Sequence, residues 1–179
     1  MNVKSAPAML AAALVAVLVA ACGGTASHND ADVAFVTGMI PHHTQAVAMS
    51  ALAADRSAAP QVKALATAIS GAQQPEIAQM QGFLSSWGQP TAPTTSSGGM
   101  SGMSGMMTDG QMRQLTASSG AAFDRMFLQM MTQHHNGAIE MADVELRAGQ
   151  STDAKALAQK IIDAQRVEIA TMKQLLTAV

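Results

Sequence analysis

Two adjacent histidines occur twice in this chain, each time among apolar residues. His42 and His43 lie within "FVTGMIPHHTQAVAM", and His134 and His135 lie within the similar stretch "FLQMMTQHHNGAIEM". A neutral imidazole binds transition metals through a nitrogen lone pair, and adjacent imidazoles are unusual on a surface that is otherwise suited to burial. The chemistry that these residues could perform is therefore the binding of a metal ion inside a folded core.

Methionines accompany both histidine pairs. Met39 and Met49 flank the first pair, and Met131 and Met141 occupy the same places around the second. Residues three or four positions apart lie on one face of an α-helix, so a methionine is expected one turn from each pair. Thioether sulfur is a good ligand for Cu(I) and a poor one for hard cations, so this mixed donor set favours copper over magnesium or calcium.

Two carboxylates belong to the same candidate site. Glu76 and Glu168 each lie in the middle of an apolar stripe further along the chain, beside a glutamine and a methionine. A buried unpaired charge is costly, so these carboxylates and the imidazoles must satisfy each other or share an ion. A single buried histidine is more often an ordinary core residue, and methionines often fill gaps. The doubled set favours a metal site, and a structural or pH-responsive pairing of His with Glu is the alternative.

A further group of methionines lies in a segment of different composition. Residues 88–110 read "GQPTAPTTSSGGMSGMSGMMTDG", which is too rich in Pro, Gly, Ser and Thr for a helix or a strand. Four of its methionines are predicted to be exposed and to contribute nothing to a core: Met100, Met103, Met106 and Met107. Beside the buried donor set, they indicate an arm that captures a soft metal, and a low-complexity linker is the alternative.

An internal repeat indicates the elements that must position these residues. A shift of 92 residues aligns 32–84 with 124–176 without a gap, and 19 of the 53 positions are identical. Apolar residues recur at three and four within each copy, which is the period of an α-helix. Breaks at 55–60 and 147–153 divide each copy into two helices. The sequence therefore predicts an all-α protein, an antiparallel four-helix bundle made of two tandemly repeated helical hairpins.

The breaks also predict the organisation of the chain. Residues 32–87 are assigned to the first hairpin, 88–110 to a crossover, and 111–179 to a short helix followed by the second hairpin. One bundle domain is therefore expected over residues 32–179.

The start of the chain has the features of a lipoprotein export signal over residues 1–21. Lys4 supplies a positive charge, an apolar stretch follows that is too short to span a bilayer comfortably, and Cys22 is the only cysteine of the chain. Lipidation of Cys22 is predicted, with residues 22–31 as a flexible tether that holds an exported protein on the membrane of the cell envelope. The alternatives are an ordinary secretory peptide and an uncleaved membrane anchor.

Composition bears on the remaining classes of function. With 10 basic and 12 acidic residues the chain carries no basic excess, and no nucleic-acid partner is expected. Four Phe, one Trp and no Tyr offer little lining for haem, and the absence of C-x-x-C-H excludes covalent haem of the usual kind. No Glu-x-x-His spacing occurs, which argues against di-iron chemistry. Iron and haem are thus less favoured than copper.

The stretches "FVTGMIPHHTQAVAM", "ASSGAAFDRMFLQMMTQHHNGAIEMA" and "IIDAQRVEIATMKQLL" resemble family 305 of the domains of unknown function. The resemblance covers about residues 30–178. It implies a ferritin-like four-helix bundle that is secreted, periplasmic or membrane-anchored, and copper binding as described for some members. The motif of the family falls on Met39, His42, His43, Met49 and Glu76, and again on Met131, His134, His135, Met141 and Glu168.

The leading hypothesis is a cell-envelope lipoprotein that binds copper, as Cu(I) or Cu(II), for sequestration, tolerance or delivery. This function needs no catalysis. The alternatives are a metal-dependent redox enzyme on the same site, b-type haem binding, and a structural or pH-responsive envelope protein without metal. A homo-oligomer and a metal-transfer partner are both left open.

Overall fold

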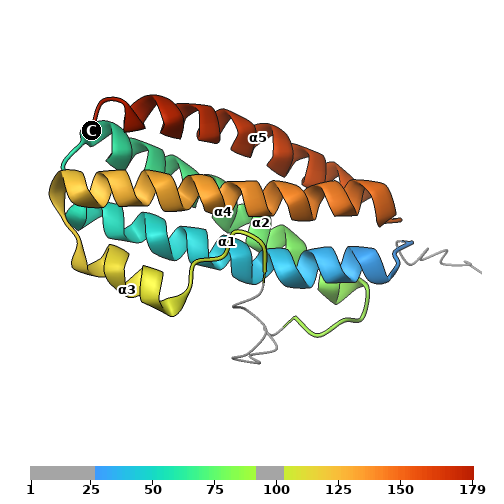
Figure 1. Cartoon of the computed structure of the whole chain (residues 1–179). Coiled ribbons are helices and arrows are strands. Elements are labelled where there is room, and N and C mark those ends of the chain that lie inside the picture. The colour runs from blue at the N-terminus through green and yellow to red at the C-terminus, as the bar shows by residue number, and fades with distance from the viewer. Residues whose placement is uncertain (1–26, 92–102) are drawn as a thin grey trace, which may run out of the picture.

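The computed structural model describes residues 27–91 and 103–179, and all regular structure within these residues is helical. The helices are α1 (Asp30–Arg56), α2 (Pro60–Ser86), α3 (Asp109–Ala117), α4 (Gly120–Ala148) and α5 (Thr152–Leu176) (Figure 1). The prediction of an all-α helical bundle is confirmed. The predicted export signal, the lipidation of Cys22, the first half of the tether (residues 22–26) and Met100 lie outside the described residues. The last two residues of the predicted tether belong to α1.

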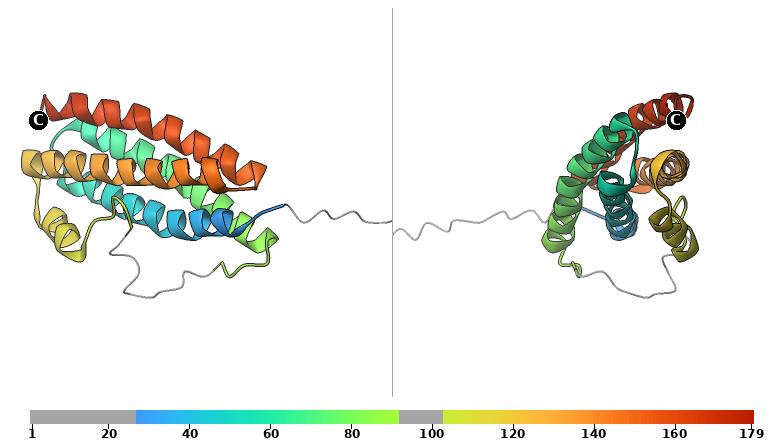
Figure 2. Two further views of the ribbon diagram at one scale, coloured as in Figure 1. Left: turned by 45° about the vertical axis from the view of Figure 1, so that its right-hand side comes forward. Right: turned by 90° about the vertical axis from the view of Figure 1, so that its left-hand side faces the viewer.

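The four long helices pair as two antiparallel hairpins, α1 with α2 and α4 with α5. The hairpins join mainly through α1 and α4, which also run antiparallel, while α2 approaches α5 on the other side (Figures 1 and 2). Helix α3 lies outside the bundle, against α1 and α4. The end of α2 and the start of α4 lie at opposite ends of the bundle, which explains the long connection between them. Among the described helices, none combines the length and apolarity needed to cross a membrane.

An aspartate of each hairpin accepts hydrogen bonds from the turn of the other hairpin. Asp124, near the start of α4, accepts hydrogen bonds from the turn between α1 and α2: from the hydroxyl of Ser57 and from the backbone N–H groups of Ala58 (3.2 Å) and Ala59 (2.9 Å). Asp32, near the start of α1, accepts hydrogen bonds from Gln150 N (3.0 Å) and Ser151 N (2.8 Å) in the turn between α4 and α5. The two aspartates are 92 residues apart and occupy the same place in the two copies of the sequence.

A second carboxyl lies beside one of these aspartates. Glu145 of α4 is fully buried, and burial together with the neighbouring Asp32 raises the pKa of Glu145 to about 8. Burial alone would raise the pKa of Asp32 as well, but backbone hydrogen bonds, that of Asn29 first, hold it below its ordinary value. Asp32 is therefore the charged member of the pair and Glu145 the protonated one at neutral pH. The residue equivalent to Glu145 in the first copy is Ala53.

The apolar core consists of two clusters of buried side chains. One contains Phe123, Phe127 and Met49, and the other contains Phe35 and Ile161. On both α1 and α4, the histidine pair comes in the sequence between residues of one cluster and residues of the other. The histidines therefore form a polar layer in the middle of the bundle, with apolar packing on either side.

Candidate metal centre

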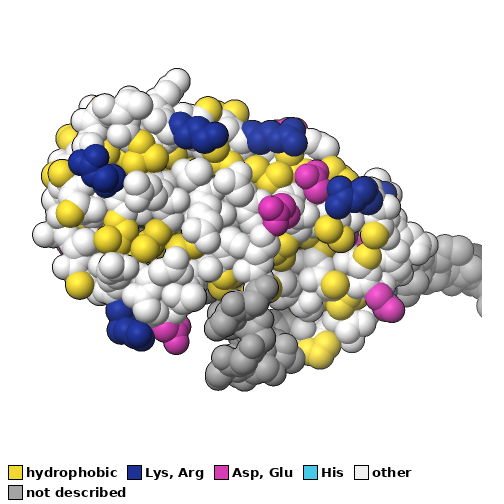
Figure 3. Space-filling view, viewed as in Figure 1, with side chains coloured by type: hydrophobic (Ala, Val, Ile, Leu, Met, Phe, Trp, Pro, Cys, Tyr) yellow, Lys and Arg dark blue, Asp and Glu magenta, His cyan; other side chains and the backbone are white. Residues whose placement is uncertain are grey.

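The two histidine pairs meet at one place in the bundle. The ring centroids of His42 and His134 are 3.8 Å apart, and those of His134 and His135 are 6.5 Å apart. All four side chains, including that of His43, are fully buried, and none is visible in the described part of the face in Figure 3. The packing of α1 on α4 thus joins both copies of the motif into one histidine cluster, defined as His42, His43, His134 and His135.

Two histidines of the cluster are paired with carboxylates from the second helix of their own hairpin. His43 Nε2 lies 3.0 Å from Glu76 Oε2, and His135 Nε2 lies 2.7 Å from Glu168 Oε2. The Lys160 ammonium of α5 lies 3.2 Å from the other oxygen of Glu76. Burial alone would raise the pKa of Glu76, but its contacts with His43 and Lys160 hold the pKa below its ordinary value. Both predicted glutamates are therefore part of the cluster's surroundings.

The remaining two histidines are neutral rings at neutral pH. Burial lowers the pKa of His42 to about 4, with a further contribution from His43. Burial, followed by the neighbouring His42 and His135, lowers the pKa of His134 well below its ordinary value. A neutral imidazole is the form that binds metal ions, so protons do not compete for these two rings at neutral pH.

The described end of the crossover, residues 103–108, lies across α1 and α4 beside the histidine cluster. His42 Nε2 is hydrogen-bonded to the backbone carbonyl of Ser104 at 3.1 Å. Gln45 of α1 forms two hydrogen bonds with the backbone of Met107, one from its amide to the carbonyl and one from the N–H to its oxygen, each 2.8 Å long. This crossover segment is thus fastened to α1 at His42, within the histidine layer, and at Gln45, about one turn further along the helix.

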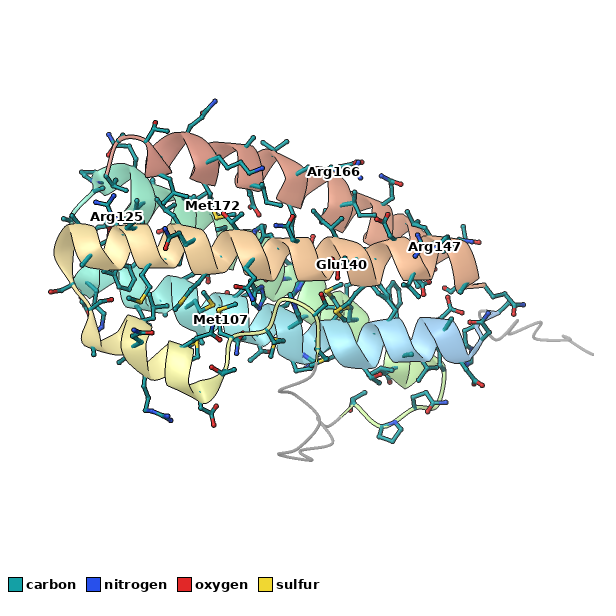
Figure 4. The ribbon with its side chains drawn as sticks, in the orientation of Figure 1. Met107, Arg125, Glu140, Arg147, Arg166 and Met172 are labelled. Atoms are coloured by element: carbon teal, nitrogen blue, oxygen red, sulfur yellow. The ribbon has the colours of Figure 1, made fainter. Side chains whose placement is uncertain are left out.

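Two glycines allow the crossover segment to approach α4 closely. A Cβ atom on Gly137 would lie 2.0 Å from the carbonyl oxygen of Ser104, so only glycine fits at that position. Gly105 has a φ of +78°, and a Cβ atom there would lie 2.9 Å from the Cα of Gly137. The Ser104 hydroxyl is hydrogen-bonded to Glu140, which Figure 4 shows on α4 where the loop passes. Sequence reasoning did not find these contacts, although a glycine in a helix beside a histidine pair was a signal.

The prediction that the crossover methionines are exposed is wrong for two of them. The exposed fractions of Met106 and Met107 are 9% and 4%, and Met107 belongs to the same apolar cluster as Phe127. The composition of the segment indicated a loop, but the turn at 103–105 directs both side chains onto the bundle, as Figure 4 shows for Met107. Met103 is half-buried. Met106 and Met107 therefore serve the core, and Met103 is the least buried of the described crossover methionines.

Met107→Ala is expected to destabilise the protein by about 2 kcal/mol, the lower end of the range for such changes, because the residue lies at the edge of the core. Urea denaturation of the two proteins measures this difference. The exposed neighbour Gln114 provides the control, since Gln114→Ala removes no buried contact. Equal stability of Met107→Ala and the parent protein would show that the crossover segment does not pack as described.

The motif methionines lie on either side of the histidine layer. Met39 and Met141 belong to or pack against one apolar cluster, and Met49 and Met131 belong to the other. Because α1 and α4 are antiparallel, each side receives one methionine from each helix. Three of the four are fully buried, and Met141 is half-buried, with its methyl group 2.9 Å from where a Cβ on Gly38 would lie.

The imidazole nitrogens of the histidine cluster are better suited to binding a metal ion than to hydrogen-bonding one another. Five buried imidazole nitrogens have no hydrogen-bond partner within residues 27–91 and 103–179: Nδ1 of His42, His43 and His135, and both ring nitrogens of His134. Buried polar atoms are normally paired, and these unpaired nitrogens are donors that a metal ion could use. In the same part of the chain no three His, Cys, Asp or Glu side chains already have the arrangement of a metal site, so binding requires side-chain rotation.

The fold is a helical bundle, and its buried layer of histidines is a candidate metal centre. The sequence matches the family called Domain of unknown function (DUF305) over residues 32–176, and the chain belongs to this family.

Known structures show the same fold. A candidate secreted DUF305 protein from Streptomyces coelicolor superposes with a TM-score of 0.75, at 35% identity over 83% of this chain and 93% of that one. CopM in its Cu(I)-bound form superposes with a TM-score of 0.70, at 28% identity over 82% of this chain and 96% of CopM. Uncharacterized protein L153 of Acanthamoeba polyphaga mimivirus is 43% identical over 53 residues, which is 30% of this chain and 35% of that protein.

Proposed function

We propose that this protein binds copper in the cell envelope, as Cu(I) or Cu(II), for sequestration, tolerance or delivery. The observation that carries the proposal is the buried histidine cluster, in which five imidazole nitrogens have no partner among the described residues. Imidazole is a good ligand for copper in both oxidation states. CopM, which has the same fold, has been solved in Cu(I)-bound and Cu(II)-bound forms, and this supports the choice of metal.

The donors divide into two kinds. The imidazoles of the histidine cluster supply nitrogen to either oxidation state, while Met39, Met49, Met131 and Met141 supply thioether sulfur that favours Cu(I). The structure supports a different role for the glutamates, since Glu76 and Glu168 are hydrogen-bonded to imidazoles and so can hold those rings in place. Haem is a poor fit, because rings whose centroids are 3.8 Å apart leave no space for a macrocycle between them.

Competition titration tests the proposed function. The purified protein is titrated with Cu(I) in the presence of a chromophoric Cu(I) chelator, and with Cu(II) in a parallel experiment. We expect the protein to retain at least one copper ion per chain in both titrations, and to ignore Mg²⁺, which prefers oxygen ligands. Complete transfer of the metal to the chelator at equal concentrations, in both oxidation states, would refute copper binding.

The proposed location rests on the sequence around Cys22 and on the fold shared with a candidate secreted protein. Lipidation of Cys22 is expected to label the protein when cells are grown with radioactive palmitate. Cys22→Ala is expected to abolish the label and to release the protein from the membrane fraction. A parent protein that carries no label would exclude the lipid anchor without affecting the proposal of copper binding.

A further inference from the structure

Three of the four histidine rings present Nε2 to an oxygen atom that can only accept a hydrogen bond. The pairs are His42 with the carbonyl of Ser104 (3.1 Å), His43 with Glu76 (3.0 Å) and His135 with Glu168 (2.7 Å). A backbone carbonyl has no proton to give, and neither has an ionised carboxylate. Nε2 must therefore carry the hydrogen in each ring, and the lone pair of the neutral ring is at Nδ1. Those three Nδ1 atoms are buried and have no partner among the described residues.

We infer that the backbone carbonyl of Ser104 is a positioning group for His42, and that copper is bound through Nδ1 of His42, His43 and His135. This inference rests on the proposed function. A histidine that binds a metal commonly donates its other N–H to a carboxylate or a backbone carbonyl, which sets the tautomer and the orientation of the ring. In this protein two such acceptors come from the bundle itself, and the third comes from the crossover segment.

The crossover segment is placed by positions at which the two copies of the sequence differ. Gly137, which admits the Ser104 carbonyl, is equivalent to Gln45, which holds Met107 by two hydrogen bonds. Glu140, which binds the Ser104 hydroxyl, is equivalent to Ala48. The histidines are the same in both copies, whereas the residues that receive the segment are not. The segment therefore adds an acceptor to one copy of the motif only.

The two rings that are in contact at the centre of the cluster, His42 and His134, differ accordingly. His42 is held by Ser104, whereas both nitrogens of His134, its equivalent in the second copy, have no partner in the described part of the chain. A ring without a fixed hydrogen bond can rotate at lower cost than one that must first break a bond. His134 is thus the ring that rotates most easily to complete the coordination. Since no three His, Cys, Asp or Glu side chains of the described residues already have the arrangement of a metal site, the other rings must adjust as well.

Gly137→Ala tests the inference, because the added methyl group would lie 2.0 Å from the Ser104 carbonyl and must displace it. Two-bond ¹H–¹⁵N NMR correlations of the metal-free full chain report the tautomer of His42. We expect Nε2–H in the parent protein and a mixture of tautomers in the variant. Competition with a Cu(I) chelator is expected to show roughly 10–100-fold weaker binding in the variant. Gly71→Ala is the matched control, since nothing lies within 4 Å of a Cβ there, and it should leave both readouts unchanged.

A second variant covers the case in which Gly137→Ala does not fold. Gln45→Ala removes the two hydrogen bonds to Met107 and adds no atom, so it loosens the crossover segment without a clash. A change of the His42 tautomer together with weaker copper binding in either variant supports the inference. Nδ1–H in the parent protein, or unchanged copper affinity in a variant whose tautomer has changed, overturns it. Failure of the parent protein to bind copper refutes the proposed function, while the tautomer of the metal-free protein still decides the role of Ser104.

Discussion

Replacing His42 and His134 together by leucine is expected to abolish tight copper binding and to stabilise the metal-free protein. The two rings are in contact and fully buried, and three of their four nitrogens have no partner among the described residues. Each unsatisfied buried polar atom costs about 1–3 kcal/mol, and leucine fills a similar volume without that cost. A gain of about 1–3 kcal/mol is therefore expected, the opposite of what removal of an ordinary core residue does.

Two measurements on the same variant decide this prediction. Urea denaturation in the presence of a metal chelator gives the change in stability, and competition with a Cu(I) chelator is expected to show binding weaker by more than about 100-fold, since the loss of a ligand exceeds the loss of an orienting group. His28→Leu is the control, because His28 stacks on Trp87, away from the cluster, with ring centroids 4.8 Å apart. A destabilised variant that still binds copper would show that His42 and His134 have a structural role.

The contribution of Glu145 to stability is expected to fall as the pH rises from about 4.5 to 8. The pKa of this buried carboxyl is about 8 in the folded protein, against an ordinary value of 4.5 that applies in the unfolded chain. Between these values the folded state holds a proton that the unfolded state has released, so raising the pH favours unfolding. The contribution is complete below about pH 4.5 and lost by pH 8, and its size is on the order of 3–5 kcal/mol.

Glu145→Gln isolates this effect. The amide can donate to Asp32 at every pH, so the free energy of unfolding of the variant is expected to exceed that of the parent protein by an amount that grows from pH 5 to pH 8 and is constant above. His42, with its pKa lowered to about 4, makes stability rise with pH between 4 and 6.5 in both proteins, and this contribution cancels in the difference. Asp163→Asn, the same change at an exposed carboxylate, is expected to show no such trend. Parallel curves for the parent protein and Glu145→Gln would refute the assignment.

The helices and the buried residues could be predicted from the sequence because both follow from local periodicity. The apolar stripe through Phe35, Met39, His42 and Ala46 shows which face of α1 is buried, and all four side chains are indeed buried. A helical wheel does not show which helix that face meets. The joining of both motifs into one cluster depends on the packing of α1 against α4, and the contact of Lys160 with Glu76 depends on the approach of α5 to α2.

The crossover was beyond prediction for a different reason. Its composition describes the chain's own preference for a loop, whereas its placement depends on two close approaches of glycine backbone and on the side chain of Gln45. Met106 and Met107 follow the turn at Gly105, and the turn delivers them to the bundle. Residue types indicated what the segment could bind, but only tertiary structure shows where it lies.

The turn of each hairpin depends on a hydrogen-bond acceptor that belongs to the other hairpin. Asp124 caps the turn of the first hairpin and Asp32 caps the turn of the second, so a fragment with one hairpin leaves that turn without its acceptor and the aspartate without its donors. Two copies of a single hairpin, related by a two-fold axis, would satisfy both needs at once, and their histidines would meet on the axis. The chain therefore has the arrangement of a dimer of hairpins, with a linker between the two halves. Because of the linker the halves cannot separate, and their sequences can differ.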